Sequence, residues 1–66
     1  MAIAKIVEVS ASSPKSFDDA IEQGIAKAAE TVRGIKGAWI SEQKIKVEDD
    51  KIVEYRVQMR VSFVVE

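Results

Sequence analysis

The 66-residue sequence contains no cysteine and no histidine. Without cysteine there is no disulfide framework, no thiolate nucleophile and no zinc ribbon or finger. Without histidine the chain lacks the commonest general base, the commonest transition-metal ligand and the usual pH switch near neutrality. The sequence also shows no glycine-rich phosphate loop, no serine in a nucleophile elbow and no paired-metal spacing. These absences argue against an enzyme.

Neither sign of charge dominates, since ten Lys and Arg face eleven Asp and Glu for a net charge of −1. A balanced chain has no bulk attraction to nucleic acid or to anionic lipid. The apolar runs are too short for a membrane span, and the start shows no apolar segment of a secretory signal, so we expect a cytoplasmic location. With 47% hydrophobic residues and only three Gly and one Pro, we expect one folded domain over residues 1–66.

Hydrophobic patterning predicts a strand, a long helix and two further strands. Residues 2–10 are rich in β-branched side chains and run into serines and a proline, which indicates a strand and a turn. A helix is expected from 14 to 35, with Ser13 as N-cap and Pro14 at its first position. Gly24 and several alanines make it slim enough to lie close to a sheet. Its apolar residues recur every three or four positions along one face: Phe17, Ile21, Ile25, Ala28, Val32 and Ile35.

Residues 38–48 and 52–65 are expected to form two strands joined by a tight loop at residues 49–51. The last strand carries apolar residues at seven consecutive odd positions from Val53 to Val65. We therefore expect one of its faces to be buried along the whole strand.

This strand is too long for so small a protein. About 14 residues span roughly 46 Å, whereas a compact 66-residue globule has a diameter of about 28 Å. The excess apolar surface must be covered by another subunit, because one short chain cannot cover it. The sequence thus predicts an obligate oligomer.

Two groups of side chains are candidates for a binding site. Glu48, Asp49 and Asp50 form an acidic cluster at the hairpin tip, which either holds a divalent cation through oxygen ligands or is a solvated turn. Trp39, the only tryptophan, either stacks on a flat ligand or packs into the core or a subunit interface.

The polar face of the last strand is a third candidate. Arg56, Gln58 and Arg60 either present a row of donors to a ligand or anion, or pair across the sheet, or are simply solvated. The pairing alternative involves Glu42, Lys44 and Lys46.

Several runs match a known family at corresponding positions: Ser12-Ser13 leading to Phe17, Ala20-Ile21 to Ala28, Thr31-Val32, Glu42-Gln43, Tyr55 and Val61-Ser62-Phe63. Through these runs the chain resembles the dodecin family, without gaps from Met1 to Phe63. The resemblance implies an α+β fold of order β-α-β-β, with a three-stranded antiparallel sheet wrapped around one long helix. It also implies a hollow homododecamer that stores or sequesters riboflavin or FMN, or in some members coenzyme A or metal ions, without catalysis.

The flavin site of the family is altered in this sequence. Gly37 takes the position of the stacking tryptophan, and Trp39 lies two residues later, about 6.7 Å along a strand. Arg56 takes the position of a glutamine that hydrogen-bonds the flavin ring, and arginine is a donor only. Val64 replaces an arginine that faces the phosphate of FMN, whereas Lys44 keeps a basic residue of that site.

We therefore expect a non-enzymatic, dodecin-like homododecamer that binds, stores or sequesters a small ligand, with flavin binding weak or absent. Its ligand, which could also be coenzyme A, would lie against the pocket positions Gly37, Trp39, Lys44, Arg56 and Gln58. One alternative is a flavin store with a site rearranged around Trp39. Another is a structural or cation-binding shell without organic cargo. In each case the partner is the chain itself, not a nucleic acid or a membrane.

Overall fold

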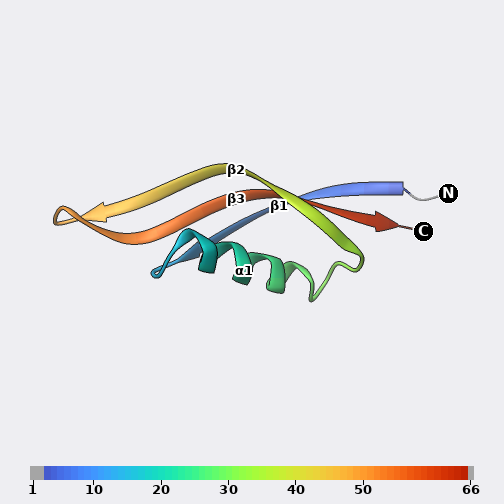
Figure 1. Cartoon of the computed structure of the whole chain (residues 1–66), viewed down its shortest axis with the longest axis horizontal. Helices are drawn as coiled ribbons and strands as arrows, with labels where there is room; N and C mark the ends of the chain where they lie inside the picture. Colours follow the sequence, from blue (N-terminus) through green and yellow to red (C-terminus); the bar gives the residue numbers. More distant parts are fainter. Residues whose placement is uncertain (1–2, 66) are drawn as a thin grey trace.

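The computed structural model describes residues 3–65 of the chain. Its elements in order are β1 (Ile3–Ser13), α1 (Phe17–Ala28), β2 (Ile35–Glu48) and β3 (Lys51–Val65). The three strands form one antiparallel sheet in the order β1-β3-β2. The helix lies along one face of this sheet against β1 and β3 (Figure 1). The predicted α+β fold of order β-α-β-β is confirmed.

The helix begins later than predicted. Ser16, not Ser13, is the N-cap, and its hydroxyl oxygen accepts a hydrogen bond of 3.0 Å from the Asp19 N–H. Ser13 instead ends β1 and is only 2% exposed. Its hydroxyl donates to the Asp19 carboxylate at 2.5 Å and accepts from the Lys15 N–H at 2.9 Å. Both serines therefore stabilise the turn into the helix, but Ser16, which directly precedes the helix, sets its first residue.

The helix also ends earlier than predicted, at Ala28 instead of residue 35. The N–H groups of Glu30 and Thr31 donate to carbonyls three residues earlier, which tightens the last turn. Gly34 then adopts a φ of 78°, a conformation that glycine reaches without steric cost. Ile35, predicted on the helix, starts β2 opposite Phe63. Ile35 fits the helical spacing in the sequence, but in the structure it belongs to β2 because it pairs with β3.

The core lies between the helix and the centre of β3. Its fully buried members are Ala20, Val57, Met59 and Val61. Gly24 allows the helix to lie close to the sheet, as the sequence predicts. A Cβ at this position would lie 2.6 Å from the Met59 Cε atom on β3. Phe17 and Tyr55 pack edge to face at the start of the helix, with ring centroids 5.2 Å apart.

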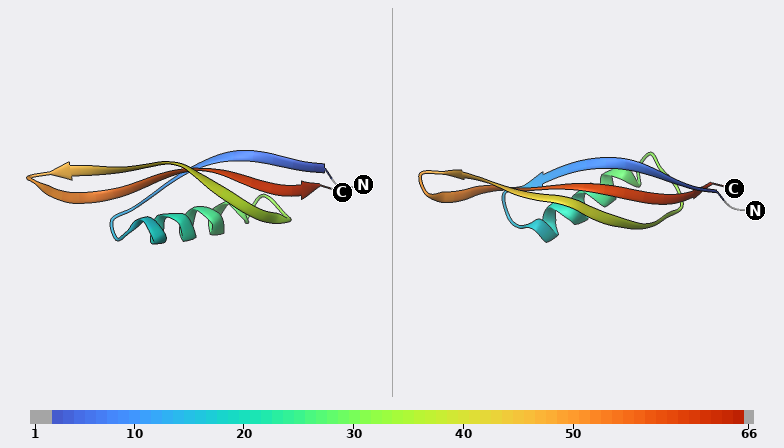
Figure 2. Two further views of the ribbon diagram at one scale, coloured as in Figure 1. Left: turned by 45° about the horizontal axis from the view of Figure 1, so that its top comes forward. Right: turned by 90° about the horizontal axis from the view of Figure 1, so that it is seen from above.

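The β2–β3 hairpin runs well past the N-terminal end of the helix (Figures 1 and 2). The molecule is 53 Å long, and its radius of gyration is 13.6 Å, against about 11 Å for a compact chain of this length. The predicted excess of strand length is confirmed. The expectation that β3 is buried throughout is wrong for the single chain, since Val53 and Val65 are each 39% exposed. A helix of 12 residues is only about 18 Å long and covers the middle of the strand.

The part of the hairpin beyond the helix, which we call the arm, exposes large apolar side chains. They are Ile45, Val47, Ile52 and Val53. Several exposed large apolar side chains on one hairpin, with Val47 and Ile52 paired directly across the strands, are typical of interaction surfaces. Between Ile3 and Val65, no helix is both long enough and apolar enough to cross a membrane.

Candidate functional site

The face of the sheet opposite the helix is polar along its centre. Arg56, Gln58 and Arg60 alternate along β3 with the buried core residues, so their side chains point away from the helix. The register places Glu42 opposite Gln58 and Lys44 opposite Arg56. The predicted row of polar side chains flanked by two strands is therefore present, and we call it the polar face.

Within residues 3–65 the ion pair across the strands of this face is on the β1 side, where Arg60 Nε lies 3.8 Å from Glu8 Oε1. The expected pairing across β2 with Glu42, Lys44 and Lys46 is not made within these residues. Arg56 donates from Nε and Nη2 to the Glu54 Oε1 atom, at 3.0 and 2.6 Å, within its own strand. The residue directly across from it, Lys44, is also a cation. Within residues 3–65, Lys44 forms no ion pair. Like charges opposite each other destabilise a sheet, and here the Glu54 carboxylate offsets the charge of Arg56.

Two hollows lie on this part of the sheet, and Lys44 and Arg56 line both. The larger, of about 450 Å³, is also lined by Ile45, Lys46, Val47 and Glu54. The smaller, of about 230 Å³, is also lined by Ser10, Glu42, Val57 and Gln58. The structure thus brings three of the predicted site residues together, namely Lys44, Arg56 and Gln58.

Trp39 lies on the same face as these residues, nearer the start of β2. A register shift between Ile40 and Glu42 leaves Ser41 without a partner and keeps Trp39 opposite Arg60. Its side chain is 57% exposed. Packing into the core of the chain is therefore wrong for Trp39, while stacking on a ligand and burial in a subunit interface remain predictions.

Gly37 is not close to Arg56 within one chain. It lies opposite Ser62, and the six-residue offset from Arg56 along β3 corresponds to about 20 Å. A Cβ at Gly37 would meet only the Ser62 hydroxyl oxygen, at 3.8 Å. A pocket that used both positions would need more than one copy of the chain.

The acidic tip is a two-residue turn instead of the predicted three-residue loop. Asp49 and Asp50 have φ of 52° and 62°, the pattern of a type I′ hairpin turn, and Lys51 already belongs to β3. Glu48 forms an ion pair of 3.5 Å with Lys46. In the described part of the chain no three acidic side chains are grouped closely enough to hold a metal ion. A cation site at the tip therefore needs ligands from further copies, and it stays a prediction.

The model of one protein family, described as Dodecin, matches residues 3–66. This chain belongs to the dodecin family. The calcium dodecin of Mycobacterium tuberculosis is 29% identical over 63 residues, which cover 96% of this chain and 89% of that protein.

Solved dodecin structures have the same fold. The dodecin from Streptomyces davaonensis is 25% identical with a TM-score of 0.93, over 98% of this chain and 96% of that one. A Thermus thermophilus dodecin variant is 26% identical with a TM-score of 0.94, over 100% of this chain and 98% of that one. A crystal structure of the M. tuberculosis calcium dodecin, described as having a novel calcium-binding site, matches with a TM-score of 0.83 at 26% identity, over 97% and 91% of the two chains.

Two carboxylates of the polar face, Glu8 and Glu54, were missed by sequence reasoning in this dodecin. Glu8 on β1 accepts a hydrogen bond of 3.4 Å from Gln58 Nε2 and lies 3.8 Å from Arg60 Nε. Glu54 lines the larger hollow and holds the guanidinium of Arg56. The sequence showed it as one more polar residue of an alternating strand. A possible signal was its position two residues before Arg56, since alternate residues of a strand share a face.

Proposed function

We propose that this dodecin assembles into a hollow homododecamer that binds a small anionic ligand on its polar face, stores or sequesters it, and does not catalyse. Family membership supports the assembly, and so does the apolar surface that the arm leaves exposed. The described polar face offers cations beside its carboxylates, and the cations Lys44 and Arg56 suit binding of an anion.

The observation that carries the proposal is that two cations, Lys44 and Arg56, lie opposite each other in the sheet. Both of them line each of the two hollows. An anion between them would replace repulsion with two charge-assisted hydrogen bonds. Trp39 lies opposite Arg60, which is four residues along β3 from Arg56. This offset places Trp39 about 13 Å from the two cations, on the same face of the sheet. A ligand with a flat ring and a phosphate chain, such as a nucleoside diphosphate, can contact both the tryptophan and the cations.

Native mass spectrometry of the purified protein, followed by calorimetric titration with ADP and with adenosine, tests this proposal. We expect a mass near twelve subunits and binding of ADP that is tighter than that of adenosine. Lys44→Ala should weaken ADP binding about tenfold to a hundredfold, since a hydrogen bond to a charged group contributes about 1.5–3 kcal/mol.

The matched control is Lys27→Ala, which removes the same charge from an exposed pair on the helix and should leave ADP binding unchanged. A monomer or dimer would contradict the assembly. Equal affinities of ADP for the wild type and the Lys44 variant would contradict the anion site.

A second candidate function is binding of a divalent cation at the acidic tip. The relative from M. tuberculosis is named a calcium dodecin, and in this chain Glu48, Asp49 and Asp50 adjoin one another at the end of the arm. In a shell, tips of several copies could contribute ligands to one ion.

Replacing Asp49 with Asn and Asp50 with Gly tests the cation site without damaging the hairpin. Asn-Gly is the preferred pair for a type I′ turn, so we expect the calcium-free variant to gain about 1 kcal/mol of stability from relief of the left-handed backbone at residue 50. If the tip binds calcium, Ca²⁺ should raise the melting temperature of the wild type and not that of the variant. A calcium shift of the same size in both proteins, or none in the wild type, would exclude this site.

A further inference from the structure

We propose that Glu54 is a built-in competitor for the anionic ligand, which holds Arg56 when the site is empty and so determines affinity and charge selectivity. This inference rests on the proposed anion site and adds a specificity-determining residue to it. The larger hollow places a carboxylate beside the same guanidinium that an anion would need.

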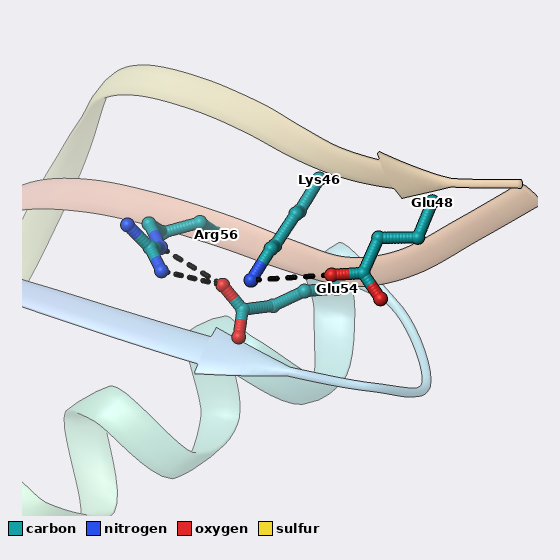
Figure 3. Close-up of polar contacts among 4 residues, drawn as sticks. All are labelled: Lys46, Glu48, Glu54 and Arg56. Atoms are coloured by element: carbon teal, nitrogen blue, oxygen red, sulfur yellow. Dashed lines mark hydrogen bonds and ion pairs between the residues drawn. The ribbon is translucent and has the colours of Figure 1, made fainter.

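The contact between Glu54 and Arg56 has the geometry of a strong pair. Two guanidinium N–H groups converge on one carboxylate oxygen, from Nε at 3.0 Å and from Nη2 at 2.6 Å (Figure 3). The Glu54 side chain is 29% exposed, against 53% for Arg56. The carboxylate is thus the more enclosed partner, and the guanidinium is the one with room to turn toward a ligand.

The neighbouring lysine is engaged elsewhere. The register places Lys46 opposite Glu54, yet its ammonium pairs with Glu48, at 3.5 Å (Figure 3). Of the three cations that line the larger hollow, two are therefore held by carboxylates of their own strand. Lys44 is the remaining one, and it has no ion pair within residues 3–65.

This arrangement predicts how an anion binds. It meets Lys44 first, and it gains Arg56 only by replacing Glu54 as the acceptor of the guanidinium. The displaced carboxylate stays on the wall of the hollow, where it repels the ligand. The repulsion grows with each negative charge on the ligand, so Glu54 penalises ADP more than AMP and has no electrostatic effect on adenosine.

Glu54→Gln removes the charge and keeps the shape and an acceptor oxygen. In calorimetric titrations at low salt, we expect this variant to bind ADP about three- to tenfold more tightly than the wild type. The gain should be smaller for AMP and absent for adenosine, and it should shrink as salt is added. Glu54→Asp, which keeps the charge, should remain closer to the wild type than to the Gln variant.

Glu30→Gln is the matched control. It removes an equal charge from an exposed ion pair with Lys27, just after the helix, and Glu30 does not line either hollow at Arg56. A general effect of net charge would increase ADP affinity equally in both variants, and that result would overturn the role of Glu54. Melting temperature and native mass, measured for each variant, show whether the fold and the assembly are retained.

The outcomes separate this inference from the proposed function. If ADP binds in a Lys44-dependent way and Glu54→Gln has no effect, the anion site stands and the competition is wrong. If neither the wild type nor Glu54→Gln binds ADP, AMP or pyrophosphate, both are wrong. Binding that appears only in Glu54→Gln would support the competition most directly.

Discussion

Truncating Met59 to alanine is expected to lower the free energy of unfolding by about 2–5 kcal/mol. Met59 is fully buried between Val57 and Val61 and is the largest side chain in the core. Its Cε atom fills the space that Gly24 leaves on the helix. Because the core of this short chain has so few fully buried members, the resulting cavity removes a large part of what holds the helix on the sheet.

Thermal and urea denaturation of the purified assembly, with native mass spectrometry of each variant, measure this loss. Met59→Leu is the control, because it conserves volume and should cost less than about 1.5 kcal/mol. Val65→Ala provides a second comparison at a position that is 39% exposed in the chain. If the Met59→Ala variant melted as the wild type does, the core would not lie where the structure places it.

Replacing Gly37 with Trp and Arg56 with Gln is expected to increase riboflavin affinity about tenfold to a thousandfold. The family resemblance places a stacking tryptophan and a ring-binding glutamine at these positions. An aromatic stack contributes about 0.5–1.5 kcal/mol, and a restored hydrogen bond in a polar site about 1–3 kcal/mol. A Cβ at Gly37 causes no clash, since it meets only the Ser62 hydroxyl oxygen, at 3.8 Å.

Quenching of riboflavin fluorescence measures the gain. The double variant Gly37→Leu with Arg56→Gln adds bulk without an aromatic ring and should gain much less. Each single variant separates the stack from the hydrogen bond. If the wild type already binds riboflavin tightly, or the double variant binds no better, the account of an altered flavin site is wrong. Tight wild-type binding that Trp39→Ala abolishes would instead support a flavin site rearranged around Trp39.

The order of the elements was predictable because each has a strong period in the sequence. The alternation from Val53 to Val65 and the three- and four-residue spacing after Phe17 both match the structure. The end of the helix was not predictable from the same signal. Val32 and Ile35 continue the helical spacing, but Gly34 turns the chain and Ile35 pairs with Phe63. The spacing of apolar residues indicates which side chains favour burial. Whether such a residue belongs to the helix or to a strand depends on its pairing in the folded chain.

The candidate site was predictable in its members and not in its contacts. Alternation alone places Arg56 and Gln58 on one face of a strand. The partner across the sheet depends on register, and the shift between Ile40 and Glu42 has no signal in the composition. For this reason the sequence could name Lys44 as one of several residues across from the Arg56 row but not as the partner opposite Arg56, and it did not predict that Glu54 holds Arg56.

The position of β3 in the sheet has a consequence for how the chain folds during synthesis. β3 lies between β1 and β2, yet it follows every other described element along the chain. Ile3 pairs with Val65 and Ser13 with Tyr55, so every contact between these strands closes a loop of about forty residues or more. Until β3 has left the ribosome, β1 and the helix have no central strand to pack against. Formation of the sheet therefore waits for β3, and the segments made earlier keep their apolar faces uncovered by a central strand until β3 is available.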